Sequence, residues 1–121
     1  MFKSTTKTPS VDKAAIQKIL SSVPYERGFH FFNGIGRYTG ETAVNLFSFY
    51  EELRTIELQS VRFHFQRKDF QNWIRETLGD AELAERIDRI DGMLSDENLK
   101  KELLKTVQAR FEELQTLSKA P

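Results

Sequence analysis

The chain has 121 residues, no cysteine, and equal numbers of basic and acidic side chains, 18 of each. This length is enough for one domain with its own core, and the lack of cysteine excludes disulfide bonds, thiolate metal ligands and a cysteine nucleophile. The balanced charge argues against nucleic-acid binding, and no apolar run reaches the roughly 20 residues of a membrane-spanning helix. With no apolar core of a secretory signal near the N-terminus, we expect a cytoplasmic protein that does not contact membranes.

The N-terminal part predicts a polar leader followed by a single domain. Residues 1–9 are rich in threonine and lysine and end in proline, so we expect them to be disordered. The folded domain is expected over residues 10–118. Ser10 is a candidate N-cap for a first helix over about 11–22, because apolar residues recur there at helical spacing until Pro24 interrupts the pattern.

The next stretch, GFHFFNGIGRYTGETA over residues 28–43, is rich in glycine and aromatic residues. Because glycine disfavours helix, we expect a loop that returns its aromatic side chains to the core. Thr39 or Gly40 then begins a second expected helix over about 41–55. Apolar residues recur on one face of that helix, and Glu41 suits the positive end of its dipole.

Residues 60–66 are open to two interpretations. Ser60 is a candidate N-cap for a short helix, whereas the alternation in Phe63-His64-Phe65 is also compatible with a strand that pairs with residues 29–32. Two strands alone would be marginally stable, so the helix is favoured.

Three capping residues predict the remaining helices. Asp69 precedes an apolar pattern that ends at Gly79, and Asp80 starts another that continues to Gly92. Ser95 precedes the clearest pattern, a long C-terminal stripe of apolar residues among lysines and glutamates. The sequence therefore predicts an all-α fold, a compact bundle of about five or six helices with a glycine- and aromatic-rich loop between the first two.

Gly34-Ile35-Gly36 invites comparison with phosphate-binding loops, since amides beside glycine can approach an anion closely. The dinucleotide fingerprint requires a third glycine at the position of Thr39, and no glycine is followed by the Lys-Ser or Lys-Thr of a Walker loop. We interpret these glycines as turn residues and expect no cofactor.

The two histidines, His30 and His64, each stand between two phenylalanines. No pair of metal-ligating residues has the spacing of a helical metal site, so we expect hydrogen-bonding histidines and no metal. Ser60 and His64 are four residues apart on the expected helix, yet no orienting acid or oxyanion site accompanies them. Ser60 as a cap and His64 as a packing residue explain both, and we expect no enzymatic activity.

Basic residues accompany both Phe-His-Phe triplets. Arg37 and Tyr38 follow the first triplet, and Arg67 follows the second. Such residues clamp phosphates or stack on bases, or they bury their aromatic rings while their charges pair with neighbours. The second interpretation is favoured.

Residues 60–84 contain, in order, a serine, Phe-His, an arginine, Asp-Phe, Trp-Ile, Gly-Asp and Leu-Ala. Together with the glycine-containing loop and apolar helix upstream, this pattern resembles a family of small prokaryotic domains, many of them archaeal, whose function is unknown. The resemblance covers about residues 28–90 and implies no activity. It implies that one set of residues belongs to a shared site or polar network: Ser60, His64, Arg67, Asp69 and Trp73.

We therefore expect a non-enzymatic accessory or regulatory domain that acts through protein–protein interaction or self-association. Its contact surface would be the C-terminal helix or an exposed aromatic patch. The first alternative is a module for a small anionic ligand, a nucleotide or phosphate, held by Arg37, His64, Arg67 and the Gly34–Gly40 amides. The second is single-stranded nucleic-acid binding. The candidate ligand-binding residues are Arg37, Tyr38, Ser60, His64, Arg67, Asp69 and Trp73.

Overall fold

The computed structural model describes residues 13–119, over which six α-helices accompany a two-stranded antiparallel sheet. The fold is thus α+β, and the prediction of an all-α fold is wrong. The predicted leader, residues 1–9, lies outside the described residues. In chain order the elements are α1 (Lys13–Leu20), the 3₁₀ turn η1 (Tyr25–Arg27), β2 (Phe29–Phe32), β3 (Tyr38–Ala43), α2 (Leu46–Thr55), α3 (Leu58–Gln66), α4 (Asp69–Trp73), the π-helical turn η2 (Ile74–Leu78), α5 (Ala81–Asp88) and α6 (Asp96–Lys119).

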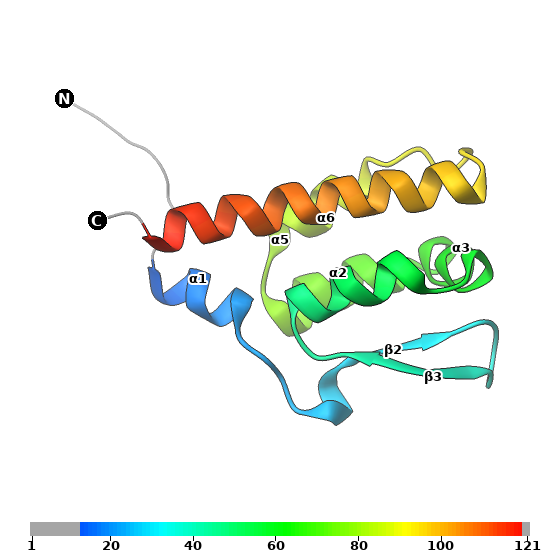
Figure 1. Ribbon diagram of the computed structural model, residues 1–121, viewed down its shortest axis with the longest axis horizontal. Helices are drawn as coiled ribbons and strands as arrows, with labels where there is room; N and C mark the ends of the chain where they lie inside the picture. The colour runs from blue at the N-terminus through cyan, green and yellow to red at the C-terminus, as the bar shows by residue number, and fades with distance from the viewer. Residues whose placement is uncertain (1–12, 120–121) are drawn as a thin grey trace.

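The elements lie in layers (Figure 1). The long helix α6 runs along one side of the molecule and contacts α1, α2, α3 and α5. Helices α2 and α3 form the middle, and the hairpin β2–β3 covers their other side through contacts of α2 with β3 and of α3 with β2. Within residues 13–119 no helix combines the length and apolar composition needed to cross a membrane.

Aromatic side chains from the hairpin and the helices meet in the core. Phe29 and Phe31 are buried on β2, and the ring of Phe29 lies 5.6 Å from Phe49 of α2. From α4, the rings of Phe70 and Trp73 lie 5.2 and 5.7 Å from Phe29. Edge and tilted contacts of this kind add to the apolar area that each ring buries, so the hairpin is part of the core and not an appendage.

The hairpin replaces the loop that was expected after residue 28. The burial of β2 alternates along the strand, as it does when one face of a strand meets the core. Phe29 pairs with Ala43, and a Cβ at Gly28 would lie only 2.6 Å from the Ala43 carbonyl oxygen. A side chain at position 28 would therefore clash with β3, so this end of the hairpin requires glycine. Gly36 and Gly40, with φ of 73° and 93°, supply the left-handed residues of the turn and of β3.

Helix α2 begins later than predicted. Residues 41–43 belong to β3, and the helix starts at Leu46 instead of residue 41. The Asn45 side chain accepts from the Ser48 amide at 2.7 Å, and the Ser48 hydroxyl accepts from the Asn45 amide at 3.1 Å. This capping box, with serine in place of the usual glutamate or glutamine, fixes the helix start.

The remaining boundaries follow local signals with two exceptions. Residues 60–66 are helical within α3, as favoured, and residues 29–32 pair with β3 instead of with them. Gly79 ends η2 with φ of 83°, and the expected N-cap bonds of Asp80 and Ser95 are formed. The exceptions are Ser60 and Asp69, neither of which caps a helix.

Candidate functional site

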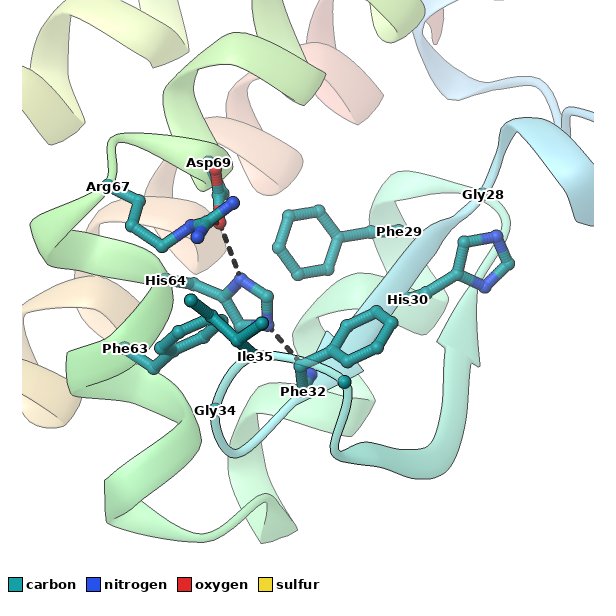
Figure 2. Close-up of a pocket in the computed structure, with 11 residues that line it drawn as sticks. Gly28, Phe29, His30, Phe32, Gly34, Ile35, Phe63, His64, Arg67 and Asp69 are labelled. Atoms are coloured by element: carbon teal, nitrogen blue, oxygen red, sulfur yellow. Dashed lines mark hydrogen bonds and ion pairs between the residues drawn. The ribbon is translucent and has the colours of Figure 1, made fainter.

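A cavity of about 380 Å³ lies between the hairpin and the end of α3 (Figure 2). Its walls come from three places in the chain: strand β2 and the residue before it, the loop after β2, and the segment from the last turns of α3 to the first residue of α4. The lining residues are Gly28, Phe29, His30, Phe32, Gly34, Ile35, Gly36, Phe63, His64, Arg67 and Asp69.

His64 ties the hairpin to the helices. Its side chain is buried, and Nε2 accepts a hydrogen bond from the backbone amide of Phe32 at 2.8 Å. Because Nε2 acts as the acceptor, the ring proton is on Nδ1, which donates to Oδ2 of Asp69 at 2.9 Å. Figure 2 shows the ring between these two partners.

Burial lowers the pKa of His64 below its usual 6.5. The nearby Asp69 carboxylate opposes this effect and the Arg67 guanidinium adds to it. The imidazole is therefore neutral near pH 7, and both of its nitrogens are engaged. A histidine in this state has no free lone pair with which to act as a general base.

Asp69 and Arg67 complete the polar wall of the cavity. Oδ2 of Asp69 also accepts from Nε of Arg67 at 3.0 Å. The guanidinium carbon of Arg67 lies 4.8 Å from the centre of the Phe63 ring, which is the distance of a cation–π contact. Lys68 has a left-handed backbone, with φ of 64°, and this turn brings Asp69 back toward His64. Asp69 thus accepts hydrogen bonds from the side chains of His64 and Arg67, and it is not the N-cap that its position suggested.

Ser60 and Trp73 bind backbone carbonyls near the two ends of β2, and neither lines the cavity. The Ser60 hydroxyl donates to the Phe32 carbonyl at 2.7 Å, and Nε1 of Trp73 donates to the Arg27 carbonyl at 2.9 Å. Ser60 and His64 therefore bind the carbonyl and the amide of the same residue, Phe32. Their spacing of four residues places both side chains within hydrogen-bond reach of the Phe32 backbone.

Arg37 and Tyr38 do not line the cavity. The Tyr38 hydroxyl is hydrogen-bonded to the Tyr25 hydroxyl at 2.9 Å and to Thr42. The Arg37 stem packs beside the loop, its Cδ 3.6 Å from the position that a Cβ of Gly34 would take. Of the seven candidate residues, the structure brings three together at the cavity: His64, Arg67 and Asp69.

The apolar wall was not among the candidates. Phe32 and Phe63 are half-buried in it, and Ile35, at 86% exposure, stands at its edge between two glycines. A large apolar residue between glycines in a loop is the signal that could have identified Ile35, because such a side chain has no core to enter. Phe32 and Phe63 carry no comparable local signal.

The described residues contain no group of three or more His, Asp or Glu side chains placed to hold a metal ion. The cavity offers instead an apolar wall, one guanidinium, one carboxylate and the backbone of three glycines. Such a wall can bind an apolar group and orient one polar end.

Comparisons with known proteins give a family and no activity. No curated protein and no solved structure matches the chain. The sequence profile of one family, described as a family of unknown function (DUF5752), matches residues 26–121, which include the hairpin and all elements of the cavity wall. The chain therefore belongs to the DUF5752 family of proteins of unknown function.

Proposed function

We propose that the protein is a non-enzymatic binding module that docks a partner protein on its hairpin. The observation that carries the proposal is the cavity of about 380 Å³ next to an exposed aromatic face. We define the hairpin surface as Tyr25, His30, Phe32, Ile35 and Tyr38 together with the cavity that they border.

The hairpin surface is continuous. The ring of His30 lies 5.0 Å from Tyr25 and 6.0 Å from Tyr38, and the ring of Phe32 lies 5.5 Å from Tyr38. Tyr25 and Tyr38 are 59% and 42% exposed, so this outward face of the hairpin meets solvent. Exposed patches rich in tyrosine and phenylalanine are typical of protein-binding sites, where rigid rings supply contact area at low entropic cost.

The polar groups of the site favour binding over catalysis. His64 is engaged at both nitrogens, and Asp69 is shared between His64 and Arg67. These bonds hold the cavity wall in place. The pair that the sequence singled out is also occupied, because His64 has no free lone pair and the Ser60 hydroxyl donates its proton to the Phe32 carbonyl.

The proposal extends to the setting of the protein. We infer a cytoplasmic protein, since a chain without cysteine suits a reducing compartment. A prokaryotic origin is proposed from the resemblance of residues 28–90 to small prokaryotic domains. We also propose that family members share Ser60 and His64, because the two side chains bind the carbonyl and the amide of the same residue, Phe32. An alignment in which these positions vary independently would contradict that statement.

A photo-crosslinking residue at position 35 tests the proposed function in cells that express the protein. Position 93 is the matched control, because Met93 is also a loop residue and is 90% exposed. We expect position 35, and not position 93, to yield one defined product, either a dimer or an adduct with an identified protein. Purified, that partner should bind the native chain and lose affinity for Ile35→Ser. Equal labelling from both positions, or none from either with a strictly monomeric mass, would contradict the proposal.

A further inference from the structure

The cavity has the size and lining of a site for one apolar group. Its volume of about 380 Å³ is near the lower end of ligand sites, which span roughly 300–1,000 Å³. Phe29, Phe32, Ile35 and Phe63 provide most of its wall, and the glycines add backbone without side chains. A bulky side chain or a single aromatic ring suits this space.

The polar end of the cavity presents a guanidinium with unused donors. Nε of Arg67 is occupied by Asp69, whereas its two Nη groups make no hydrogen bond with any residue in 13–119. The cation–π contact with Phe63 and the bond to Asp69 keep the guanidinium beside the cavity wall. The free Nη edge of a fixed guanidinium is suited to a carboxylate, which can accept two parallel hydrogen bonds.

The charges nearby select a single negative charge. Asp69 lines the same wall and would repel a polyphosphate, and the neutral His64 contributes no positive charge. Among the described residues that line the cavity, Arg67 is the one arginine or lysine. The free edge of a single guanidinium complements one carboxylate and not the several negative charges of a nucleotide.

From this arrangement we infer that the cavity binds an apolar group that ends in a carboxylate, and that the partner supplies it as its own C-terminus. The last residue of the partner is bulky and apolar and enters the cavity, while its carboxylate binds Arg67. This inference rests on the proposed function and names the part of the partner that the site takes. A free organic acid has the same chemistry, so the two sources are separated by experiment.

The test uses two pairs of probes on the full chain. One pair is a five-residue peptide that ends in phenylalanine, with a free or an amidated C-terminus; the other is 3-phenylpropionate and 3-phenylpropanamide. Binding is followed by the amide signals of Gly34 and Gly36 in nitrogen-15 NMR spectra, which are simple to assign because the chain has only six glycines. We expect the free peptide to bind about tenfold or more tightly than the amidated peptide, the usual effect of a charge-assisted pair.

Arg67→Gln should abolish this preference, and Arg54→Gln should retain it. Arg54 is the matched control because it has the same 53% side-chain exposure and also forms one ion pair with an acidic side chain. Equal binding of the free and amidated peptides would overturn the inference and leave the proposed function standing. Binding of 3-phenylpropionate without the peptide would overturn the C-terminus as the source. Failure of every probe, with a partner crosslinked at position 35, would overturn the inference alone.

Discussion

Two acidic clusters in this protein follow the same local plan and differ in what surrounds them. Asp80 follows Gly79 and Asp69 follows Lys68, and both preceding residues have a left-handed backbone with φ of 83° and 64°. Each aspartate then binds an arginine. The side chains of Asp80 and Arg110 are 1% and 5% exposed, whereas those of Asp69 and Arg67 are 27% and 53% exposed.

The sealed cluster is a joint between helices. Arg110 of α6 binds both carboxylate oxygens of Asp80, with Nε to Oδ2 at 2.9 Å and Nη2 to Oδ1 at 3.0 Å. Its third nitrogen donates to Glu113 at 2.6 Å, and Asp80 also accepts from the Leu83 amide. Each guanidinium nitrogen of Arg110 and each carboxylate oxygen of Asp80 has a partner, and both side chains are buried, so this cluster fixes α5 on α6.

The open cluster leaves donors unused. Asp69 is held by His64 and Arg67, but the Nη groups of Arg67, which lines the cavity, make no hydrogen bond with any residue in 13–119. We therefore propose that an ion pair in this fold serves structure when both partners are buried and saturated. When one partner is half exposed and only partly bonded, it is available for recognition.

The largest effect is expected from the sealed cluster. Arg110→Met leaves the carboxylate of Asp80 buried without its partner, so we expect the free energy of unfolding in urea to fall by about 3–5 kcal/mol. Asp80→Asn combined with Arg110→Met removes the unpaired charge and should recover part of this loss. A loss below about 1 kcal/mol for the single variant would show that the joint is not structural.

A smaller loss is expected from the backbone clamp of the open cluster. His64→Leu removes the acceptor of the Phe32 amide, and an unsatisfied buried amide costs about 1–3 kcal/mol. His64→Gln retains an oxygen near the position of Nε2 and should lose less. The measurement is urea unfolding together with hydrogen exchange of the Phe32 amide. Identical losses in the two variants would indicate that His64 contributes by packing and not by this hydrogen bond.

We expect His64 to make the free energy of unfolding depend on pH. Its pKa is lowered in the folded protein, mainly by burial, so below the usual 6.5 the unfolded chain binds a proton that the folded chain does not. Stability is therefore highest above pH 6.5 and falls as the pH drops from 6.5 to the folded pKa, by at most about 1.4 kcal/mol per pH unit. The difference between the native chain and His64→Gln in urea unfolding isolates this slope. A constant difference between pH 7.5 and 5 would contradict the assignment.

The local sequence pattern predicts the role of Asp80 in the sealed cluster correctly and that of Asp69 in the open cluster wrongly. Both Asp69 and Asp80 resemble N-caps, but only Asp80 binds an amide of its own helix. Asp69 is drawn away by the imidazole of His64, and the sequence does not show that this ring is within reach. Arg110 was missed because it belongs to a charged helix surface in sequence, and its burial depends on where α5 packs.

The hairpin was missed for a related reason. Four residues of β2 are too few for a confident strand, and their stability comes from Phe29 and Phe31 packing on α2 and α4, which is not a local property. The glycines indicate a turn but not the direction of the chain after it. The sequence therefore predicts Arg37 as a ligand-binding residue, whereas in the structure it does not line the cavity. The hairpin nevertheless meets the Phe63-His64-Phe65 segment of α3, through the hydrogen bond from the Phe32 amide to His64.

The smallest effect on stability is expected for Arg67→Gln, and this variant tests most directly whether Arg67 binds a ligand or stabilises the fold. Arg67→Gln removes a half-exposed ion pair, and such pairs contribute about 0–1 kcal/mol, so the urea unfolding of this variant should match that of Arg54→Gln within about 1 kcal/mol. Only the peptide affinity should distinguish the two variants. If Arg67→Gln instead lost as much stability as His64→Leu, Arg67 would be a structural partner of Asp69. The open cluster would then differ from the sealed one in exposure alone.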